Sequence, residues 1–576
     1  MKIVLIAPLF MFSLLAHASA PKITWMKSNS DSVGLYEKFE ISLNLNAEYT
    51  NPFDPDQIDL MAVFTAPSGK KWPINGFYEY SHGAAWKLRF SPNELGNWTY
   101  SLELKDKNGR ATGPSGSFFT TSSSGKGILK IAANRRFLQH QDGSSFYGVG
   151  FWYNDAYTGF NSGQVKGEVL DNLKKLGVNF IGTFITPLET IGSGLGRYDQ
   201  NICGRLDELL TLCEDRNMYL SLNLWFHAFL SDTVWGGGNI RWYTNPYQQV
   251  TSAKDFYRSP EAWKLQEKLY RYFIARWAYS QYLADWFVID EVNGTQGWVT
   301  GDSAMANRWA AKVQDYFSRN DPYRHLTTGT RSGGIREYWQ EGYQTFDLAA
   351  REIYEAQGYP MNQSGTLEGV SVHPLAQSYG IYAGQINKLW NGFDKPAIIG
   401  ESGWDHTFYE PGMPGYLALY HNALWVSMAS GAAMTPFWWA YSNKLNEVLV
   451  SSQLSSIRKF TDQIPFARLT HPAVASIQVS GGDGFAISTH EMIYGWVVNP
   501  QTDVAGKKVR IDQVPDGTYR LKVYHTWRGQ FLDTTTVSSV HGTLSFTIPV
   551  LHMDGHANYI GQDIAFILEP AELKKP

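Results

Sequence analysis

The sequence has little cysteine. Cys203 and Cys213 are its two cysteines among 576 residues, and they lie at the ends of a segment with a helical pattern. About ten residues of helix separate two Cα atoms by roughly 15 Å, whereas a disulfide needs them within about 7 Å. We therefore expect two free, buried thiols. No Cys/His cluster has zinc-ligand spacing, and neither a metal nor a cofactor is predicted.

The sequence also lacks an excess of one charge sign and a long apolar run. Lys and Arg total 49 and Asp and Glu total 53, a net charge of −4, so no basic surface for nucleic acid is predicted. No stretch beyond the N-terminus approaches 18 uninterrupted apolar residues, so membrane insertion is not expected. The Gly-x-Ser-x-Gly elbow of serine hydrolases and the His-Glu-x-x-His helix of zinc hydrolases are absent, which disfavours both classes.

The chain opens with the pattern of a secretory signal. A lysine precedes the apolar run Ile3–Leu15, and small residues follow. Cleavage is expected after Ala18, because Pro21 directly follows the competing site. Residues 1–18 are therefore interpreted as a signal peptide, and the absence of a nearby cysteine disfavours a lipid anchor. The mature protein is predicted to be secreted or periplasmic.

Residues 19–121 alternate apolar and polar side chains with a period of two. FEISLNLN at 39–46 and WTYSLELK at 98–105 are examples. This alternation is typical of antiparallel strands with one buried face, and turn signals such as PSGKK and DKNGR separate the runs. We predict an N-terminal β-sandwich that ends in the linker TTSSSGKG at 120–127.

The pattern changes in residues 122–465, where short apolar runs without alternation are followed by helical or loop segments. Parallel strands that are buried on both faces have this pattern. The eight runs are FYGVGF, VNFIGTF, MYLSLNLW, WFVID, HLTTGT, FDLAA or GVSVHPL, PAIIGE and MTPFWW. They predict a (β/α)8 TIM barrel. A doubly wound sheet is the alternative, but Gly148 and Gly150 lack the third glycine of its phosphate turn.

Alternation returns in residues 466–576, for example at Tyr519, Leu521 and Val523. This block is predicted to be a second β-sandwich. The expected fold class is therefore multidomain, α/β plus β, with a central barrel between two β-sandwiches.

Two acids directly follow apolar strands of the predicted barrel. Glu291 follows WFVID, and Glu401 follows PAIIG. The carboxyl ends of barrel strands gather at one face, where active sites lie. A carboxylate at a buried strand end is costly to desolvate unless it is paired, hydrated or used. The two acids are candidate catalytic groups, although each alone could be an ordinary polar strand end.

These segments resemble a known group of enzymes. FVIDEVNG resembles the strand-four acid/base motif of clan A glycoside hydrolases, and KPAIIGESGW resembles their strand-seven nucleophile motif. GLYEKFEISL, NGFYEY and RFSPNELGNWTYSL resemble the immunoglobulin-like module often found ahead of such barrels. The resemblance covers most of the chain at the level of architecture. It implies an exported hydrolase that cleaves a polysaccharide or oligosaccharide.

The resemblance implies a role for each acid. Glu291 would be the general acid/base and Glu401 the nucleophile of a retaining, double-displacement reaction, which places two carboxyls about 5–5.5 Å apart. Clan members usually carry Asn before the acid/base, where this chain has Asp290. An ionised Asp accepts but cannot donate a hydrogen bond, so Asn293 is a candidate for the missing donor. The exact family and the sugar at the reacting subsite are thereby left open.

Other strand ends supply candidate substrate-binding residues. They are Trp152, Asn154, Trp225, His227, Tyr354, His373, Trp404 and Trp439. Strand six is ambiguous, since either FDLAAREIY, with Tyr354 beside a third acid, Glu352, or GVSVHPL, with His373, could form it. Alternation favours Trp439 over Trp438 as the inward ring. For any one Trp, core packing is an equally good explanation.

Two loops are also candidates for function. The long loop 227–252 could shape subsites through Trp235, Trp242 and Tyr243, since long structureless loops in barrels are often functional. The segment 51–59 contains Asp54, Asp56 and Asp59. These acids could bind calcium, but they lack EF-hand spacing, which favours a plain turn.

Two other functions remain open. The chain could be a non-catalytic carbohydrate-binding protein with a degenerate barrel, a hypothesis that Asp290 and the two predicted sandwiches motivate. It could also be a polysaccharide lyase that uses Glu291 with a His or Tyr.

Overall fold

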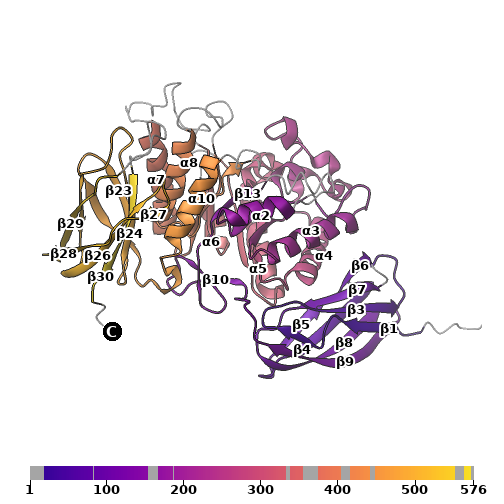
Figure 1. The fold of residues 1–576 in the computed structure, drawn as a ribbon. Coiled ribbons are helices and arrows are strands. Elements are labelled where there is room, and N and C mark those ends of the chain that lie inside the picture. Colours follow the sequence, from indigo (N-terminus) through magenta and orange to yellow (C-terminus); the bar gives the residue numbers. More distant parts are fainter. Residues whose placement is uncertain are drawn as a thin grey trace, which may run out of the picture.

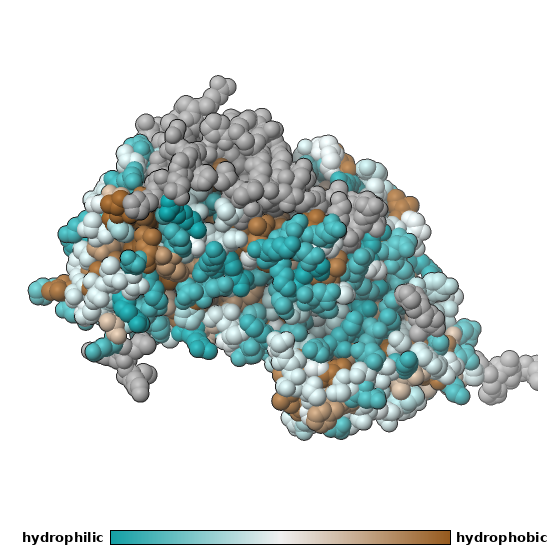
Figure 2. All heavy atoms as spheres, viewed as in Figure 1, coloured by the Kyte–Doolittle hydropathy of each residue, from teal (hydrophilic) through white to brown (hydrophobic). Residues whose placement is uncertain are grey.

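The structure is a computed structural model. It describes residues 19–81, 84–153, 167–185, 187–332, 338–354, 374–403, 416–440, 448–551 and 563–572. A central body of helices and parallel strands lies between an N-terminal group of strands and a C-terminal sheet (Figure 1). Within the described residues, no helix is both long and apolar enough to cross a membrane. Hydrophilic residues cover much of the viewed face of the helical body, and hydrophobic residues form small separate groups (Figure 2).

The N-terminal strands form two sheets around one core. The first has the order β1 (Lys22–Ser28), β3 (Phe39–Asn46), β7 (Ala84–Phe90), β6 (Phe77–Ser81), and the second β2 (Ser32–Gly34), β9 (Gly109–Thr121), β8 (Gly96–Asp106), β4 (Ile58–Thr65), β5 (Lys71–Asn75). Phe39 of the first sheet stacks on Phe118 of the second at 3.9 Å between ring centroids. Buried and less buried residues alternate along β4, so the period-two prediction for these strands is confirmed.

Charged residues join the N-terminal strands to the central body. Asp54 and Asp56 both contact Lys268 Nζ, at 2.6 and 2.8 Å, and Asp59 contacts Arg271 at 2.5 Å. Lys268 and Arg271 belong to α4 (Pro260–Trp277). The three acids that could have formed a calcium site are thus paired with the cations of this helix.

Six parallel strands of the central body form one sheet. Their order is β17 (Leu326–Gly329), β16 (Leu283–Ile289), β15 (Tyr219–Asn223), β14 (Phe180–Phe184), β13 (Gly150–Tyr153), β20 (Trp439–Ala440). A separate parallel pair consists of β18 (Ala349–Tyr354) and β19 (Ala397–Gly403). The Ser402 N–H donates to the Phe437 carbonyl at 2.7 Å, and the Leu348 N–H donates to the Thr327 carbonyl at 3.1 Å. These bonds link the pair to both ends of the larger sheet.

Helices follow most of these strands. They are α2 (Gly167–Lys175), α3 (Gln200–Glu214), α4, α5 (Ser303–Asn320), α6 (Gln340–Thr345), α7 (Pro374–Gly392), α8 (Tyr416–Ala429) and α10 (Val448–Thr461). Shorter turns are η1 (His227–Leu230), η2 (Gly237–Asn239), η3 (Trp242–Thr244), η4 (Pro246–Gln249), η5 (Ala253–Asp255), η6 (Val292–Gly294), the π-helical η7 (Gly297–Gly301) and η8 (Phe466–Arg468). Cys203 and Cys213 are buried and free in α3, as predicted.

Apolar side chains of the parallel strands pack together in one core. Trp152, Phe287 and Phe437 belong to this core, with the Trp152 ring 5.4 Å from each of the other two rings. A small sheet of β10 (Leu129–Ile131), β11 (Leu138–His140) and β12 (Ser145–Phe146) contributes Leu129, Leu138 and Phe146 to it.

The C-terminal strands form one continuous antiparallel sheet. In chain order they are β21 (Ala473–Val474), β22 (Ser476–Val479), β23 (Asp483–Ser488), β24 (Ile493–Val498), β25 (Lys508–Asp512), β26 (Gly517–His525), β27 (Gln530–Phe531), β28 (Thr535–Val540), β29 (Thr543–Thr547) and β30 (Asp563–Pro570). Val497 and Phe566 face a core of this sheet's own, whereas Trp496 and Tyr524 share the core of the central helices. Both faces of β24 are therefore buried.

Candidate active site

Four acids and a histidine lie at the carboxyl ends of neighbouring parallel strands. His227 begins η1 after β15, Asp290 and Glu291 follow β16, Glu352 lies in β18, and Glu401 lies in β19. The β18–β19 register places Glu352 opposite Glu401. Since the strands are parallel, these residues gather at one edge, the edge at which barrel enzymes place their chemistry.

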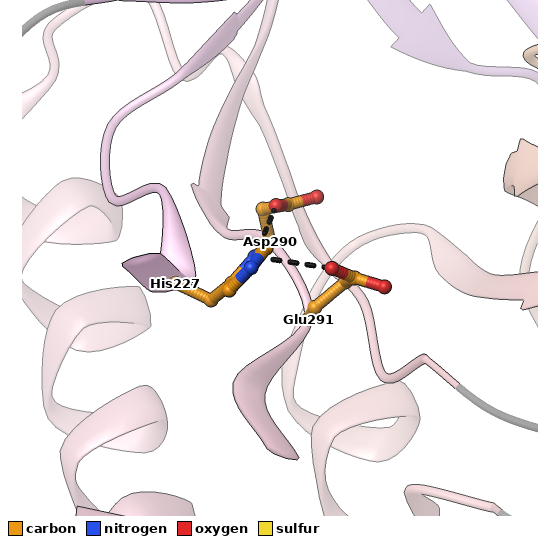
Figure 3. Close-up of side chains that lie close together, drawn as sticks. All are labelled: His227, Asp290 and Glu291. Atoms are coloured by element: carbon orange, nitrogen blue, oxygen red, sulfur yellow. Dashed lines mark hydrogen bonds and ion pairs between the residues drawn. The ribbon is translucent and has the colours of Figure 1, made fainter. Parts of the chain in front are cut away.

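His227 bridges the two adjacent acids (Figure 3). Its Nδ1 lies 3.0 Å from Asp290 Oδ2 and 3.1 Å from Glu291 Oε2, and its Nε2 lies 3.2 Å from Asn239 Oδ1. Burial works against the imidazolium form, but Glu291 and Asp290 outweigh it and raise the pKa of His227. The cation that results offsets part of the negative charge of the two acids.

The backbone at Glu291 is strained. Its φ of 47° and ψ of 59° lie in the left-handed region, which costs a non-glycine residue about 1–3 kcal/mol. Thr330 holds this turn, because its hydroxyl accepts from the Glu291 N–H and its carbonyl accepts from the Val292 N–H, both at 3.0 Å. The strained turn leaves the Glu291 side chain 13% exposed, so its carboxyl can reach a ligand.

Glu352 lies among like charges. One carboxylate oxygen each from Asp290, Glu352 and Glu401 lie within 4.8 Å of one another. Glu352 is completely buried, and neither of its oxygens receives a hydrogen bond from an N–H or hydroxyl donor of the described residues. Burial and the charges of Glu291, Glu401 and Asp290 raise its pKa well above the ordinary range, and its carboxyl contacts that of Glu291. Two carboxyls in contact favour sharing one proton.

Asp290 is also held toward its protonated form. Burial is the largest cause that raises its pKa, and the nearby charge of Glu291 adds to it. One oxygen of Asp290 faces His227, while Oδ1 has no hydrogen-bond partner among the described residues. Asn223, at the end of β15, is also buried. Among the described residues, neither its amide nitrogen nor its amide oxygen has a hydrogen-bond partner. These groups could bind the hydroxyls of a ligand.

The same spacing would also suit a metal ion. His227, Asp290 and Glu291 form one set of ligand atoms within 4.8 Å, and Asp290, Glu352 and Glu401 form another. Hard cations such as calcium bind carboxylate oxygens at about 2.3–2.6 Å. Oxygens that lie this close to one another could bind one such cation together. The predicted lack of a metal therefore needs its own test.

Two of the predicted sugar-binding rings lie in the core instead. Trp152 is completely buried, stacks on Phe184 at 4.6 Å and donates its indole N–H to the Gly400 carbonyl at 2.8 Å. Trp225 is 3% exposed and donates to the Tyr270 hydroxyl at 2.9 Å. Neither ring offers a face to a ligand, so the packing explanation applies to both.

The side chain of Asn293 forms hydrogen bonds with the main chain. Its amide N–H donates to the Ser332 carbonyl, and its carbonyl accepts from the Ser332 N–H, both at 2.9 Å. The side chain fixes the segment that follows β17. One amide N–H and the amide oxygen of Asn293 thus fix this segment, and the second amide N–H is the donor that would remain for a ligand.

The remaining candidates lie partly or wholly outside the described residues. Asn154, His373 and Trp404 fall outside them. Tyr354 ends β18 and Trp439 begins β20, and the structure describes the backbone of both. Strand six is therefore the segment that carries Tyr354. Glu352 on the same strand received no role from sequence, although a lone acid in the run AAREIY was the available signal.

Comparisons with known proteins agree with this architecture. Residues 32–105 match the model of a family described as "Domain of unknown function (DUF5060)", and no curated protein matches the chain. The crystal structure of a "putative glycoside hydrolase" from Bacteroides vulgatus ATCC 8482 is similar with a TM-score of 0.63 and 16% identity, over 94% of this chain and 100% of that one. At this identity the likeness shows the fold alone.

Weaker structural neighbours are also glycoside hydrolases. The exo-β-1,4-mannosidase Op5Man5 from Opitutaceae bacterium strain TAV5 has a TM-score of 0.45 and 15% identity, over 59% of this chain and 63% of that one. A family 39 glycoside hydrolase from Bacteroides cellulosilyticus WH2 has a TM-score of 0.43 and 13% identity, over 95% and 100%. Scores this low do not bear on the substrate.

Proposed function

We propose that the protein is an exported retaining glycoside hydrolase in which Glu291 is the general acid/base and Glu401 the nucleophile. The observation that carries the proposal is the cluster of acids around these two residues at the carboxyl edge of the parallel strands. Glu352 interacts with both of them, so they belong to one electrostatic site. The predicted signal peptide supports export.

We further propose that the eight parallel strands close into a (β/α)8 barrel of the clan A type. The bonds from Ser402 to Phe437 and from Leu348 to Thr327, which join β18 and β19 to their neighbours, support closure. The two N-terminal sheets would then be the immunoglobulin-like module ahead of the barrel, and the continuous C-terminal sheet, which folds over a core of its own, an accessory β-sandwich. The full-length likeness to the Bacteroides vulgatus protein supports this arrangement.

In the proposed reaction, the Glu401 carboxylate attacks the anomeric carbon while Glu291 donates its proton to the glycosidic oxygen. The bond between that carbon and oxygen breaks, and the leaving-group alcohol departs. A water molecule then attacks the glycosyl-enzyme as Glu291 takes its proton. Glu401 is released as a carboxylate, and the sugar retains its anomeric configuration.

The neighbouring groups prepare Glu291 for this work. His227 lies 3.0 Å from Asp290 and 3.1 Å from Glu291 and so fixes the positions of both carboxyls. The carboxyl of Glu352 keeps a proton beside Glu291, which must be protonated when the leaving group departs. Asp290 would accept a hydrogen bond from a sugar hydroxyl through its unpartnered Oδ1.

The test is digestion of a panel of polysaccharides and aryl glycosides by wild type, Glu291→Gln, Glu401→Gln and Glu208→Gln. Glu208 is exposed on α3 and serves as the matched control. Removal of the acid/base is expected to slow cleavage about 10²–10⁴-fold, and less for aryl leaving groups that need no protonation. Glu401→Gln should abolish cleavage of every substrate, and NMR should show the retained anomer as the first product.

Three results would contradict the proposal. Undiminished hydrolysis by Glu401→Gln would remove the nucleophile, an inverted first product would exclude the double displacement, and an ultraviolet-absorbing unsaturated product would indicate a lyase. Glycan binding without any cleavage would favour a degenerate barrel. Activity is expected to survive chelation by EDTA, which separates the proton-sharing interpretation of the acids from a metal site.

A further inference from the structure

Trp235 is a large apolar side chain that the fold leaves half exposed beside the acids. It is 49% exposed, whereas Trp242, in the same loop after β15, is 8% exposed. Full burial of such a ring would be favourable, so its exposure needs an explanation. The loop follows the carboxyl end of a strand and thus lies at the edge that carries the candidate active site.

The ring is connected to Glu291 through a single residue. Trp235 packs against His227 with ring centroids 5.1 Å apart and an angle of 64° between their planes. His227 Nδ1 lies 3.1 Å from the Glu291 carboxylate. The exposed indole therefore lies on the side of the site occupied by the candidate acid/base.

The loop holds Trp235 firmly in this place. Its backbone has a φ of 60°, a left-handed conformation that is costly for a non-glycine residue. On its N-terminal side, the Val234 N–H donates to the Ser231 hydroxyl at 2.9 Å, and Thr233 donates to Gln296 through its N–H and hydroxyl at 3.1 and 3.0 Å. The loop is thereby bonded to the segment just beyond Glu291.

Gly294 makes room for the ring. A Cβ at this position would lie 2.5 Å from Cζ3 and 2.8 Å from Cη2 of Trp235, and 2.9 Å from Cδ2 of His227. Any side chain at residue 294 would displace one of the two rings. Since Gly294 belongs to the turn that begins at Glu291, the indole packs directly against the backbone that carries the acid/base.

We propose that Trp235 is a platform for the sugar ring on the leaving-group side of the scissile bond. The inference rests on the proposed function, because the acid/base carboxyl contacts the glycosidic oxygen and so marks the side from which the leaving group departs. A flat, half-exposed indole suits the apolar C–H face of a sugar ring. The predicted ligand is an oligosaccharide with at least one sugar beyond the cleaved bond.

Two substrates with the same glycone separate this role from a structural one. The first is the shortest oligosaccharide that the wild type cleaves in the panel above, and the second is the glycosyl fluoride of its glycone, whose leaving group has no ring. Trp235→Ala is expected to raise KM for the oligosaccharide about 10- to 100-fold and to leave kcat/KM for the fluoride within about twofold of wild type. Trp235→Phe, which keeps a ring, should recover most of the loss.

Trp25→Ala is the matched control, since Trp25 is also half exposed, at 44%, but lies in β1 of the N-terminal strands. It should change neither substrate. Equal losses on both substrates would mean that Trp235 acts only by supporting His227, and no loss on either would mean that the ring contacts no sugar; both results overturn the proposal. Failure of the wild type to cleave any glycan would instead overturn the proposed function. Calorimetric binding of the oligosaccharide to Glu401→Gln, with and without Trp235→Ala, distinguishes the two failures.

Discussion

Glu352 is a carboxyl group whose environment disfavours its charge. It is completely buried, and the largest electrostatic effects on it come from Glu291, Glu401 and Asp290, all acids. The cation described in this cluster, His227, faces Asp290 and Glu291. Both burial and like charges favour the neutral form, so Glu352 should hold a proton that the same residue releases in the unfolded chain.

This proton gives a pH-dependent stability. Because the folded-state pKa of Glu352 is raised above its ordinary value of 4.5, its stabilising contribution is complete below that value and is lost as pH rises toward the folded-state pKa. Glu352→Gln mimics the neutral form. Urea denaturation measures the unfolding free energy of both proteins. As pH rises from 5 to 8, we expect the variant to become more stable relative to wild type by at least about 1 kcal/mol.

The comparison variants decide whether the neutral form matters for catalysis. Glu208→Gln should follow the pH dependence of wild type, since its side chain is exposed. Near pH 6, Glu352→Gln should keep kcat/KM within a few-fold of wild type, while Glu352→Ala, which leaves a cavity, should lose more. If Glu352→Gln were inactive at every pH, the working form would be the carboxylate, as a bound cation would require.

The residues of the site differed in how far the sequence could predict them. His227, Asp290, Glu291 and Glu401 could be predicted because a charged or polar side chain directly after an apolar strand marks a carboxyl end. Trp152 could not be assigned in the same way. A parallel strand buried on both faces shows no alternation, so its sequence does not tell which rings are packed in the core and which are open to a ligand.

At the scale of elements, the pairing of β13 with β14 depends on Gly150. It lies opposite Phe180 in the parallel register, and a Cβ at residue 150 would lie 1.7 Å from the Phe180 carbonyl oxygen. The obstacle is backbone and cannot rotate away. Overpacking costs about 1–3 kcal/mol, and we expect Gly150→Ala to lower the unfolding free energy by an amount near the upper end of that range. Urea denaturation gives this free energy as the midpoint concentration multiplied by the denaturant slope m.

Gly380→Ala provides the matched control for this change. Gly380 is exposed in α7, and its Cβ would meet no atom within 4 Å. Alanine favours a helix interior over glycine by about 1 kcal/mol, so this variant should be as stable as wild type or more so. Equal effects of the two substitutions would mean that the close approach of β13 and β14 is not a constraint.

At the scale of the whole molecule, the kind of strand in each part of the chain could be predicted from the period of its hydrophobic residues, but the contacts between these parts could not. Period-two alternation indicated antiparallel strands at Phe39–Asn46. In contrast, β24 is buried on both faces because α8 packs against the sheet. Such pairings join residues far apart in the chain, and local sequence carries no signal for them.

One ion-pair cluster joins the N-terminal strands to the central helices. Asp207 of α3 lies 2.8 Å from Arg89 Nη1 of β7 and 2.6 Å from Arg276 Nη2 of α4. The side chains of Arg89 and Arg276 are 5% and 1% exposed. Burial works against the ionised form of Asp207, but the two guanidinium groups outweigh it and hold its pKa well below the ordinary range.

Loss of Asp207 should therefore loosen the docking of the N-terminal module. Asp207→Ala leaves two buried guanidinium groups without this partner, and removal of one member of a buried ion pair costs about 3–5 kcal/mol. Since the folded-state pKa is depressed, the contribution of Asp207 is present above its ordinary pKa of 3.8 and is lost as pH falls below it. The difference in unfolding free energy between wild type and Asp207→Ala should thus be largest near neutral pH and shrink toward pH 3.

Limited proteolysis within residues 122–127 should report the same loosening, with faster cleavage of the variant and no change for Glu208→Gln, one residue away. A difference that stayed constant from pH 7 to pH 3 would show that the carboxylate charge of Asp207 does not hold the two parts together.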